Sequence, residues 1–290
     1  MAGVVLVFDF DKTIIECDSD DWVVEGFGVS ELFTQLRPTF PLNTLMDFHH
    51  DNYQRFTLDA FSRLFFQDRM IMEVQSRGNS TADIAACLRQ VPLHPRIVSV
   101  IKAAHASGCD LRLISDANVF FIETILKNHG LLDCFSEINT NPSYVDGEGR
   151  LRISPYHDFE SSSHGCNICP PNMCKGLIME RVQASVSATG KKRFIYLGDG
   201  TADFCPGLKL GEDDFLMPRK NFPVWELICS NPKLIRANIH EWNDGEELGD
   251  VLSHLVNKIS IEENYAVGVD QMVPVHCKFK TSSVPAHAAF

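Results

Sequence analysis

The sequence predicts an α/β fold, in which a doubly wound parallel sheet carries a small helical cap inserted after its first strand. Three features lead to this prediction. Short apolar segments without polar alternation recur along the chain, which is typical of strands buried on both faces. Segments with helical periodicity lie between them. The stretch 17–91 departs from this rhythm, because it has helical patterns but no buried strand.

The elements are expected in a simple order. The predicted strands lie at 4–8, 111–114, 194–197 and 215–217. Apolar stripes predict core helices at 97–104, 121–126, 178–186 and 248–259, and shorter cap helices at 22–25, 31–36 and 81–89. We therefore expect a catalytic core made of 1–16 and 92–260 and a cap at 17–91. Residues 261–290 have no steady period, so we expect a disordered tail there.

Composition restricts the classes of function. The 290 residues include 26 Lys and Arg but 38 Asp and Glu, a formal net charge of −12. This balance argues against nucleic acid or an anionic membrane as the main partner, because both require basic surfaces. The negative net charge does not exclude a small phosphorylated ligand, because one pocket can be locally positive on an acidic protein. Neither a membrane span nor a signal peptide is expected, and reduced cysteines indicate a cytoplasmic location. The oligomeric state is not predicted.

Two acids follow the first predicted strand. Asp9 and Asp11 stand where ligands bind in parallel α/β sheets, outside the carboxyl ends of the strands. Side by side, the two carboxylates would repel each other, and Mg²⁺ prefers such oxygen ligands. For an isolated pair, a turn with two solvated acids explains the pattern equally simply.

Three further sets of residues make that simple explanation insufficient. Ser115 ends the second predicted strand and precedes a helix, whose free N–H groups can bind phosphate. Asp199 and Asp203 lie on a glycine-containing loop after a later strand, and Lys175 stands near the start of a helix. Each has an ordinary explanation as a cap, a turn or a solvated lysine. Together, and in this order, they indicate one phosphate site.

These motifs resemble those of the haloacid dehalogenase (HAD) superfamily of phosphohydrolases. Within it, the sequence is similar to the phosphoethanolamine/phosphocholine phosphatase family, in particular its plant branch, which has thiamine phosphate phosphatase-like and pyrophosphatase-like members. The resemblance covers about residues 4–260. Its strings are FDFDKTIIECDSDDWVV, LISDAN, SPYHDF, HGCNICPPNMCKG, YLGDGTADFCP and MPRKNFPVW.

The resemblance implies a HAD-like, Rossmannoid core and a role for each motif. Asp9 would be the nucleophile that forms an aspartyl-phosphate, and Asp11 the general acid and base. Ser115 and Lys175 would neutralise the phosphoryl oxygens. Mg²⁺ would be held by Asp9, the backbone carbonyl of Asp11 and Asp199. Asp203 would bind the metal directly or support its ligands.

Two more acids are candidates for substrate binding. In the resembling family, acids at the positions of Asp20 and Asp116 are associated with a cationic head group. The alternative is that they cap helices, and both explanations stay open. A cationic substrate would be thiamine monophosphate, phosphocholine or phosphoethanolamine. Inorganic pyrophosphate, the main alternative, would leave both acids without a cation.

A cysteine-rich segment precedes Lys175. His164, Cys166, Cys169 and Cys174 could bind a structural Zn²⁺, which takes four such ligands. We favour the other interpretation, a proline-rich loop with reduced thiols that positions Lys175. The remaining cysteines considered are expected to act as small buried hydrophobic residues. They are Cys17, Cys87, Cys109, Cys134, Cys205 and Cys229.

The cap sequence departs from the family pattern. Relatives usually run from a segment like 43–47 almost directly into one like 68–70, whereas residues 48–67 intervene here. We favour an unusual loop or a gene-model artefact over an altered cap that changes substrate choice, because long loops are well tolerated. His49 and His50 are then expected to be solvated.

The leading hypothesis is a Mg²⁺-dependent hydrolase of small phosphorylated metabolites. A catalytically silent phosphate-binding regulatory protein is the alternative from another class, but such a protein would be expected to have lost Asp9 or Asp11. A phosphotransferase or mutase, which passes the phosphoryl group to an acceptor other than water, is a third option.

Overall fold

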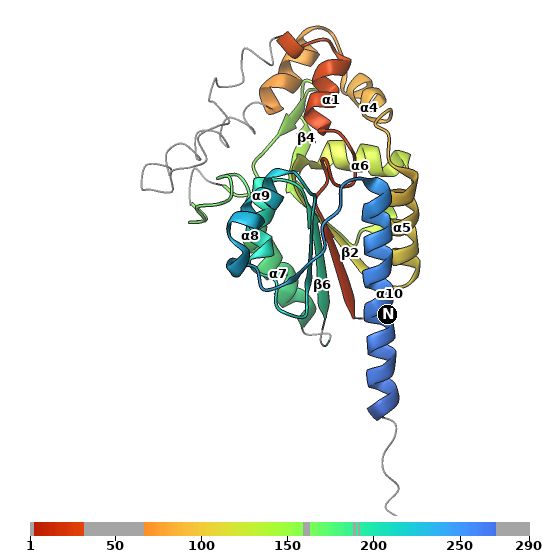
Figure 1. The fold of residues 1–290 in the computed structure, drawn as a ribbon. Coiled ribbons are helices and arrows are strands. Elements are labelled where there is room, and N and C mark those ends of the chain that lie inside the picture. Colours follow the sequence, from red (N-terminus) through yellow and green to blue (C-terminus); the bar gives the residue numbers. More distant parts are fainter. Residues whose placement is uncertain (1–2, 32–66, 159–162, 188–189, 191, 271–290) are drawn as a thin grey trace, which may run out of the picture.

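The computed structural model describes residues 3–31, 67–158, 163–187, 190 and 192–270. A six-stranded parallel sheet runs through these residues in the order β3-β2-β1-β6-β7-β8, which confirms the predicted α/β class (Figure 1). Its strands are β1 (Val4–Phe8), β2 (Asp110–Asn118), β3 (Glu137–Asn141), β6 (Arg193–Gly198), β7 (Phe215–Pro218) and β8 (Asn238–Ile239). Of these, β1, β2, β6 and β7 correspond to the predicted strands.

Helices cover both faces of the sheet. One face carries α5 (Pro95–Ala106), α6 (Val119–Asn128) and α10 (Gly245–Asp270), with the 3-10 turn η1 (Leu132–Cys134). The other carries α7 (Lys175–Ser187), α8 (Phe204–Gly207) and α9 (Pro223–Ser230), with η2 (Thr201–Asp203) and η3 (Pro232–Leu234). Figure 1 shows α5 and α10 side by side, across the sheet from α7 and α8.

The central strand explains why the apolar segments do not alternate with polar residues. Val4, Leu6 and Phe8 of β1 lie in the hydrophobic core on one side of the sheet. Val5 and Val7 lie in the core on the other side. Each face of β1 is therefore buried, as the uninterrupted apolar run predicts.

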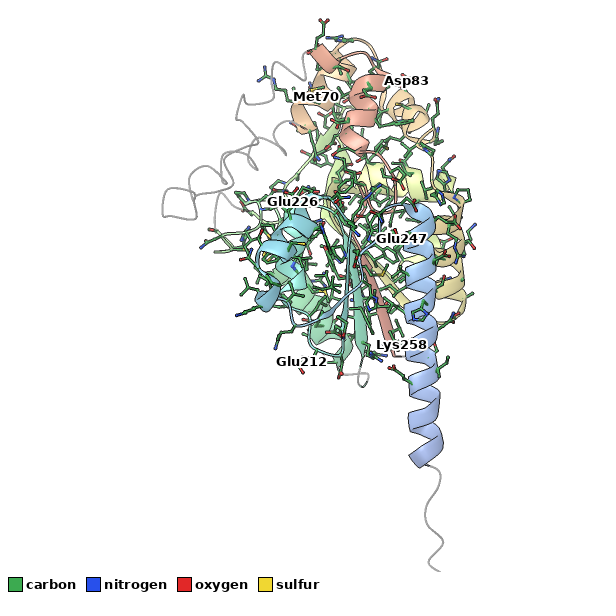
Figure 2. The ribbon with its side chains drawn as sticks, in the orientation of Figure 1. Met70, Asp83, Glu212, Glu226, Glu247 and Lys258 are labelled. Carbon is green, nitrogen blue, oxygen red and sulfur yellow. The ribbon has the colours of Figure 1, made fainter. Side chains whose placement is uncertain are left out.

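The described part of the expected cap is helical and lies beyond the carboxyl ends of the strands (Figure 1). It contains α1 (Ser19–Gly26), a helix at 67–76 and α4 (Thr81–Leu88). Figure 2 places Met70 and Asp83 of these helices at the opposite end of the molecule from Glu212. The expected insertion at 48–67 lies outside the described residues, apart from Gln67, as does the predicted helix at 31–36 beyond Glu31.

A short β-hairpin contacts the cap helix at 67–76. It consists of β4 (Ser143–Val145) and β5 (Leu151–Ile153), which pair antiparallel. Arg152 forms an ion pair with Asp68, and the N–H of Leu151 donates to Oε1 of Gln75 at 3.0 Å. The hairpin comes from the chain between β3 and α7, so it adds a contact to the cap that sequence reasoning did not predict.

The C-terminal helix is longer than expected. Ile259 is fully buried and ends the apolar stripe, whereas Ile261 is 56% exposed. The helix nevertheless continues to Asp270, so the expectation of a disordered tail is wrong for 261–270, and 271–290 lie outside the described residues. Within the described residues, the chain contains no helix that is long and apolar enough to cross a membrane.

Candidate active site

The nucleophile position lies at the carboxyl end of the central strand. Asp9 follows β1 directly, and its N–H donates to the carbonyl of Leu197 in β6 at 2.9 Å. Its Oδ1 accepts from the N–H of Phe10 at 2.7 Å, and the Phe10 ring is fully buried. The chain then turns sharply, with Lys12 in the left-handed region at a φ of 54°. The backbone thus holds the Asp9 carboxylate at this edge of the sheet.

Lys175, the first residue of α7, forms buried ion pairs with two acids. Its Nζ lies 2.8 Å from Oδ2 of Asp9 and 2.8 Å from Oδ1 of Asp203. The side chains of Asp9 and Asp203 are 6% and 0% exposed and that of Lys175 is 2% exposed, so solvent screens these contacts little. Burial acts to lower the pKa of Lys175, but the carboxylates of Asp203 and Asp9 raise it well above its ordinary value.

Each carboxylate oxygen of Asp203 accepts hydrogen bonds from two protein groups. Its Oδ1 also accepts from the hydroxyl of Tyr196 at 2.7 Å. Its Oδ2 accepts from the N–H groups of Asp199 and Gly200 at 3.0 and 2.8 Å. A Cβ on Gly198 would come within 2.4 Å of Asp203 Cγ, so this close approach requires glycine. Asp203 therefore organises the loop that follows β6.

Three carboxylates converge beside the lysine. Oxygens of Asp9, Asp199 and Asp203 all lie within 4.8 Å of one another, and Oδ1 of Asp199 accepts from the Thr13 hydroxyl at 3.4 Å. Burial, followed by the charge of Asp203, raises the pKa of Asp9 well above its ordinary value and that of Asp199 to about 7. One ammonium does not balance three buried carboxylates, and a divalent cation suits this donor set.

The Asp11 carboxylate contacts the start of the cap. Its Oδ1 accepts from the N–H of Ser19 at 3.0 Å and its Oδ2 from the Ser19 hydroxyl at 3.1 Å. Ser19 is the first residue of α1, and the carboxylate is buried. The proposed general acid is thus fixed where the first strand's loop enters the cap.

Ser115 is fully buried near the end of β2, on the strand beside β1. Its Oγ accepts from the N–H of Ala117 at 3.3 Å. The register of β2 shifts between Ile114 and Asn118, and the strand runs four residues past its predicted end. The helix α6 begins at Val119 with Asn118 as its N-cap.

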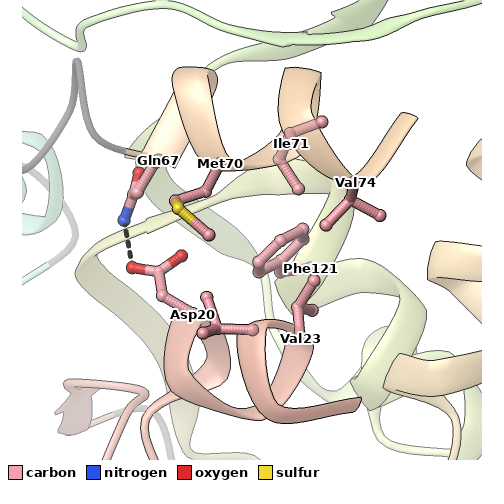
Figure 3. A pocket seen from close by; sticks show the side chains of 8 residues that line it. Asp20, Val23, Gln67, Met70, Ile71, Val74 and Phe121 are labelled. Atoms are coloured by element: carbon pink, nitrogen blue, oxygen red, sulfur yellow. Dashed lines mark hydrogen bonds between the residues drawn. The ribbon is translucent and has the colours of Figure 1, made fainter. Parts of the chain in front are cut away.

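The capping explanation for Asp20 and Asp116 is wrong. The N-cap of α1 is Asp18, and that of α6 is Asn118. Asp20 lies in the first turn of α1, where its Oδ2 accepts from Nε2 of Gln67 at 2.6 Å (Figure 3). The same Nε2 lies 3.5 Å from the carbonyl of Asp116. Gln67 thus links the Asp20 carboxylate to the backbone of Asp116, and the charge of Asp116 contributes to raising the pKa of Asp9.

Arg219 ties the segment after β7 to the nucleophile loop. Its guanidinium donates to the carbonyl of Lys12 at 2.6 Å and to Oε2 of Glu16 at 2.6 Å. It also lies over the rings of Phe222 and Trp242, at 4.4 and 5.0 Å from their centroids. A nearly buried arginine therefore braces the turn that contains Asp11.

The cysteine predictions need correction. Four thiols converge, but they are Cys166, Cys169, Cys174 and Cys205, and His164 is not among them. His164 instead pairs with backbone groups, through Nε2 to the carbonyl of Pro170 and through Nδ1 to the N–H of Cys166. Cys205 is buried, but within this cluster rather than among hydrocarbon side chains. Of the other cysteines expected to be buried, Cys109 is buried, Cys17, Cys87 and Cys134 are only partly buried, and Cys229 is exposed.

Sequence reasoning missed four side chains that shape the site. Thr13 belongs to the same motif as Asp9 and Asp11, so its place in the site could have been predicted from the sequence. Tyr196 lies on a buried strand, where a lone hydroxyl needs a partner. Arg219 and Gln67 act across long sequence separations, and nothing in their local sequence indicates their contacts.

The fold and this arrangement of acids first define the class of protein. The chain resembles a solved HAD family hydrolase from Salmonella enterica serovar Typhi with a TM-score of 0.54. The two are 16% identical, and the match covers 84% of this chain and 68% of that one. This likeness confirms the HAD-like core.

Sequence comparison then identifies the family. The model of the family described as "Putative Phosphatase" matches residues 4–55 and 49–256. "Inorganic pyrophosphatase 2" of Arabidopsis thaliana is 48% identical over 283 residues, which are 97% of this chain and 94% of that protein. "Thiamine phosphate phosphatase-like protein" of the same species is 50% identical over 265 residues, 91% of this chain and 100% of that protein. The chain belongs to this phosphatase family.

Proposed function

We propose that the chain is a Mg²⁺-dependent phosphatase that hydrolyses a small phosphorylated metabolite through an aspartyl-phosphate. The observation that carries this proposal is the contact of a buried Lys175 with Asp9 in a cluster that also contains Asp199 and Asp203. A nucleophile, a fixed cation and metal-type ligands are then in one place, as phosphoryl transfer requires.

In the first chemical step, an Asp9 carboxylate oxygen attacks phosphorus and the bond to the leaving oxygen breaks. Asp11 donates its proton to that oxygen, so the product leaves as an alcohol. In the second step, Asp11 takes a proton from water, whose oxygen attacks the phosphorus of the aspartyl-phosphate. The P–O bond to Asp9 breaks, which releases inorganic phosphate and restores the carboxylate.

Asp9, the carbonyl of Asp11 and Asp199 would hold the Mg²⁺, and when bound it supplies positive charge to the phosphoryl oxygens. Asp203 would support this site through its contacts with Lys175 and with the backbone of Asp199. The hydroxyl of Ser115 would donate a hydrogen bond to a phosphoryl oxygen. Lys175 would orient Asp9 and neutralise charge beside it.

The cap at 17–91 would close over these residues and exclude bulk water. Ser19 supports this role, because it links the Asp11 carboxylate to the start of the first cap helix. The core would comprise 1–16 and 92–260, and the Asp68–Arg152 ion pair would hold the hairpin against the cap.

The substrate class follows from Asp20 and Asp116. Neither caps a helix, and Gln67 holds them together at the border between cap and core. A leaving group with a fixed positive charge would complement these acids, as in thiamine monophosphate, phosphocholine or phosphoethanolamine. We favour this class. Inorganic pyrophosphate is the second candidate, since a relative named as a pyrophosphatase is 48% identical.

Phosphate release from a panel of substrates tests both proposals. Purified protein with Mg²⁺ is assayed with the four compounds, and kcat/KM is compared between the wild type, Asp20→Asn and Asp116→Asn. We expect the cationic substrates to be preferred, and each substitution to lower their kcat/KM about tenfold while leaving pyrophosphate unchanged. Equal losses for pyrophosphate would contradict the cationic assignment. No release from any phosphorylated compound above an Asp9→Asn control would refute the phosphatase proposal and favour the silent phosphate-binding protein.

A further inference from the structure

Outside the acid cluster, the described residues contain one other set of side chains with the donor chemistry of a metal site. The Sγ atoms of Cys166, Cys169, Cys174 and Cys205 all lie within 4.8 Å of one another. Three of these residues are buried and Cys166 is partly exposed. Cys166, Cys169 and Cys174 come from the loop before α7, and Cys205 comes from α8, two residues after Asp203 in the sequence.

The spacing of the sulfur atoms fits a tetrahedral thiolate site. Two ligands of a tetrahedral Zn²⁺ with Zn–S bonds of about 2.3 Å are about 3.8 Å apart. The Sγ atoms of Cys166 and Cys205 are 3.7 Å apart. A disulfide would require about 2.05 Å, and all four cysteines are free.

The backbone around Cys166 provides a second, independent indication. The N–H groups of Ile168 and Cys169 both point at Cys166 Sγ, each at 3.4 Å. A neutral thiol is a weak acceptor, whereas a metal-bound thiolate carries negative charge that such donors stabilise. Two N–H groups within one Cys-x2-Cys turn therefore orient this sulfur as a ligand.

The packing leaves little room for any other arrangement. A Cβ on Gly176 would lie 2.4 Å from Cys205 Sγ, so the start of α7 needs glycine to admit that sulfur. The Sγ of Cys169 also approaches the carbonyl of Ala202, at 4.0 Å. The four thiols thus converge on one point between the loop and α8, instead of spreading through a hydrocarbon core.

From these observations we propose that Cys166, Cys169, Cys174 and Cys205 form a structural Zn²⁺ site. Each thiol that binds loses its proton to solvent, so zinc binding forms four Zn–S bonds and releases protons without any oxidation. Soft thiolates favour Zn²⁺ over Mg²⁺, which keeps this site distinct from the carboxylate cluster.

The site would join the two segments that hold the catalytic lysine. Cys174 directly precedes Lys175, and Cys205 follows Asp203 by two residues. The Lys175–Asp203 contact therefore lies beside a metal crosslink between the same two segments. Zinc would fix the start of α7 against α8 and so support the position of the ammonium. This site does not depend on the substrate or on the proposed phosphatase activity.

The test is the metal content of tag-free, full-length protein produced with zinc supplied and purified under reducing conditions. We expect about one Zn²⁺ per chain in the wild type. Cys205→Ser should lose most of it, whereas His164→Ala and the surface control Cys229→Ser should keep it. Absence of zinc from the wild type, or retention in Cys205→Ser, would overturn the proposal. Loss in His164→Ala would overturn the four-cysteine donor set.

Thiol counting on the wild type keeps the test decisive if Cys205→Ser does not fold. In native protein, four cysteines should resist a thiol reagent until a strong chelator is added, and the proteolytic fragments identify them. The Tm should also fall after chelation and recover with Zn²⁺. A disulfide within the four, or the same reactivity with and without chelator, would contradict the proposal.

Discussion

The Nζ of Lys175 lies 2.8 Å from Oδ1 of Asp203, and both side chains are almost completely buried. The same nitrogen contacts Asp9, and Asp203 also accepts from the N–H of Asp199. Asp203 therefore fixes both the ammonium beside Asp9, the proposed nucleophile, and the loop that carries Asp199, the proposed metal ligand. Several measurable effects follow from this arrangement.

Removing the ammonium should damage both stability and catalysis. Lys175→Met leaves two buried carboxylates without their counter-charge, and breaking a buried pair typically costs about 3–5 kcal/mol. We expect a loss of this size in the free energy of unfolding in urea, and a fall in kcat/KM of at least about 100-fold. A variant that kept wild-type stability and activity would show that the buried contacts are unimportant.

Tyr196→Phe is the milder change at the same point. It removes one hydrogen bond to Asp203 but leaves Lys175 and the two backbone donors in place. We expect a loss of about 1 kcal/mol in unfolding free energy and an activity effect much smaller than that of Lys175→Met. An activity loss as large as that of Lys175→Met would indicate that the hydroxyl itself takes part in the chemistry.

Arg219 should act on catalysis through the loop it braces. Lysine cannot reproduce the forked contacts with the carbonyl of Lys12 and with Glu16, so Arg219→Lys should let the loop carrying Asp11 shift. We expect kcat to fall about 10- to 100-fold with a smaller change in KM. Arg96→Lys, at an ion pair with Asp250 between α5 and α10, is the matched control, because Arg96 does not contact the Asp11 loop in the described residues, and it should have little effect. If Arg219→Lys and Arg96→Lys lowered kcat equally, Arg219 would have no specific role in positioning the loop that carries Asp11.

Metal affinity should depend on pH because the Asp199 carboxyl has a pKa raised to about 7, mainly by burial. Below that value the group is protonated, and Mg²⁺ must displace the proton to bind. From Asp199 alone, we expect the affinity to fall by up to about tenfold per pH unit as the pH drops below 7. Calorimetric Mg²⁺ titrations at several pH values measure this, and an affinity independent of pH would contradict the assignment.

The same pKa predicts how the stability of metal-free protein changes with pH. The folded state keeps a proton on Asp199 between its ordinary value of 3.8 and about 7, where the unfolded state has lost it. Stability should therefore decrease as the pH rises through this window. Saturating Mg²⁺ should reduce the decrease, because the ion favours the charged carboxylate. Unfolding midpoints with and without Mg²⁺ provide the comparison, and an increase in metal-free stability across the window would oppose the prediction.

The sequence predicted those strands that are apolar on both faces, because burial dictates their composition. It did not predict β3, whose residues Glu137, Asn139 and Asn141 are polar, or β8, which has two residues. Their positions depend on pairing with β2 and β7, which local sequence does not express. The β4–β5 hairpin was missed for the same reason, since Arg152 and Asp68 are far apart in the chain.

The site motifs could be predicted because each follows a strand, and parallel strands end at one edge of the sheet. The structure brings together Asp9, Lys175, Asp199 and Asp203 as that reasoning implies. Cys205 was assigned to the hydrophobic core, because no nearby cysteine signals that it meets a loop far earlier in the chain. Likewise, backbone geometry decides that Asp18 and Asn118 are the N-caps of α1 and α6. Several neighbouring polar residues could have served as N-caps, so the sequence alone does not choose among them.

The most direct test of the account is where the phosphoryl group is attached during turnover. Asp11→Asn should slow hydrolysis of the aspartyl-phosphate, whereas its formation from 4-nitrophenyl phosphate, whose leaving group needs no proton, should continue. The variant is therefore mixed with that substrate and Mg²⁺, quenched in acid and mapped by mass spectrometry. The account predicts a phosphorylated peptide modified at Asp9, absent from an Asp9→Asn, Asp11→Asn double variant. A phosphoryl group on another residue, or 18O from water entering the carboxylate of Asp9 during turnover by the wild type, would contradict it.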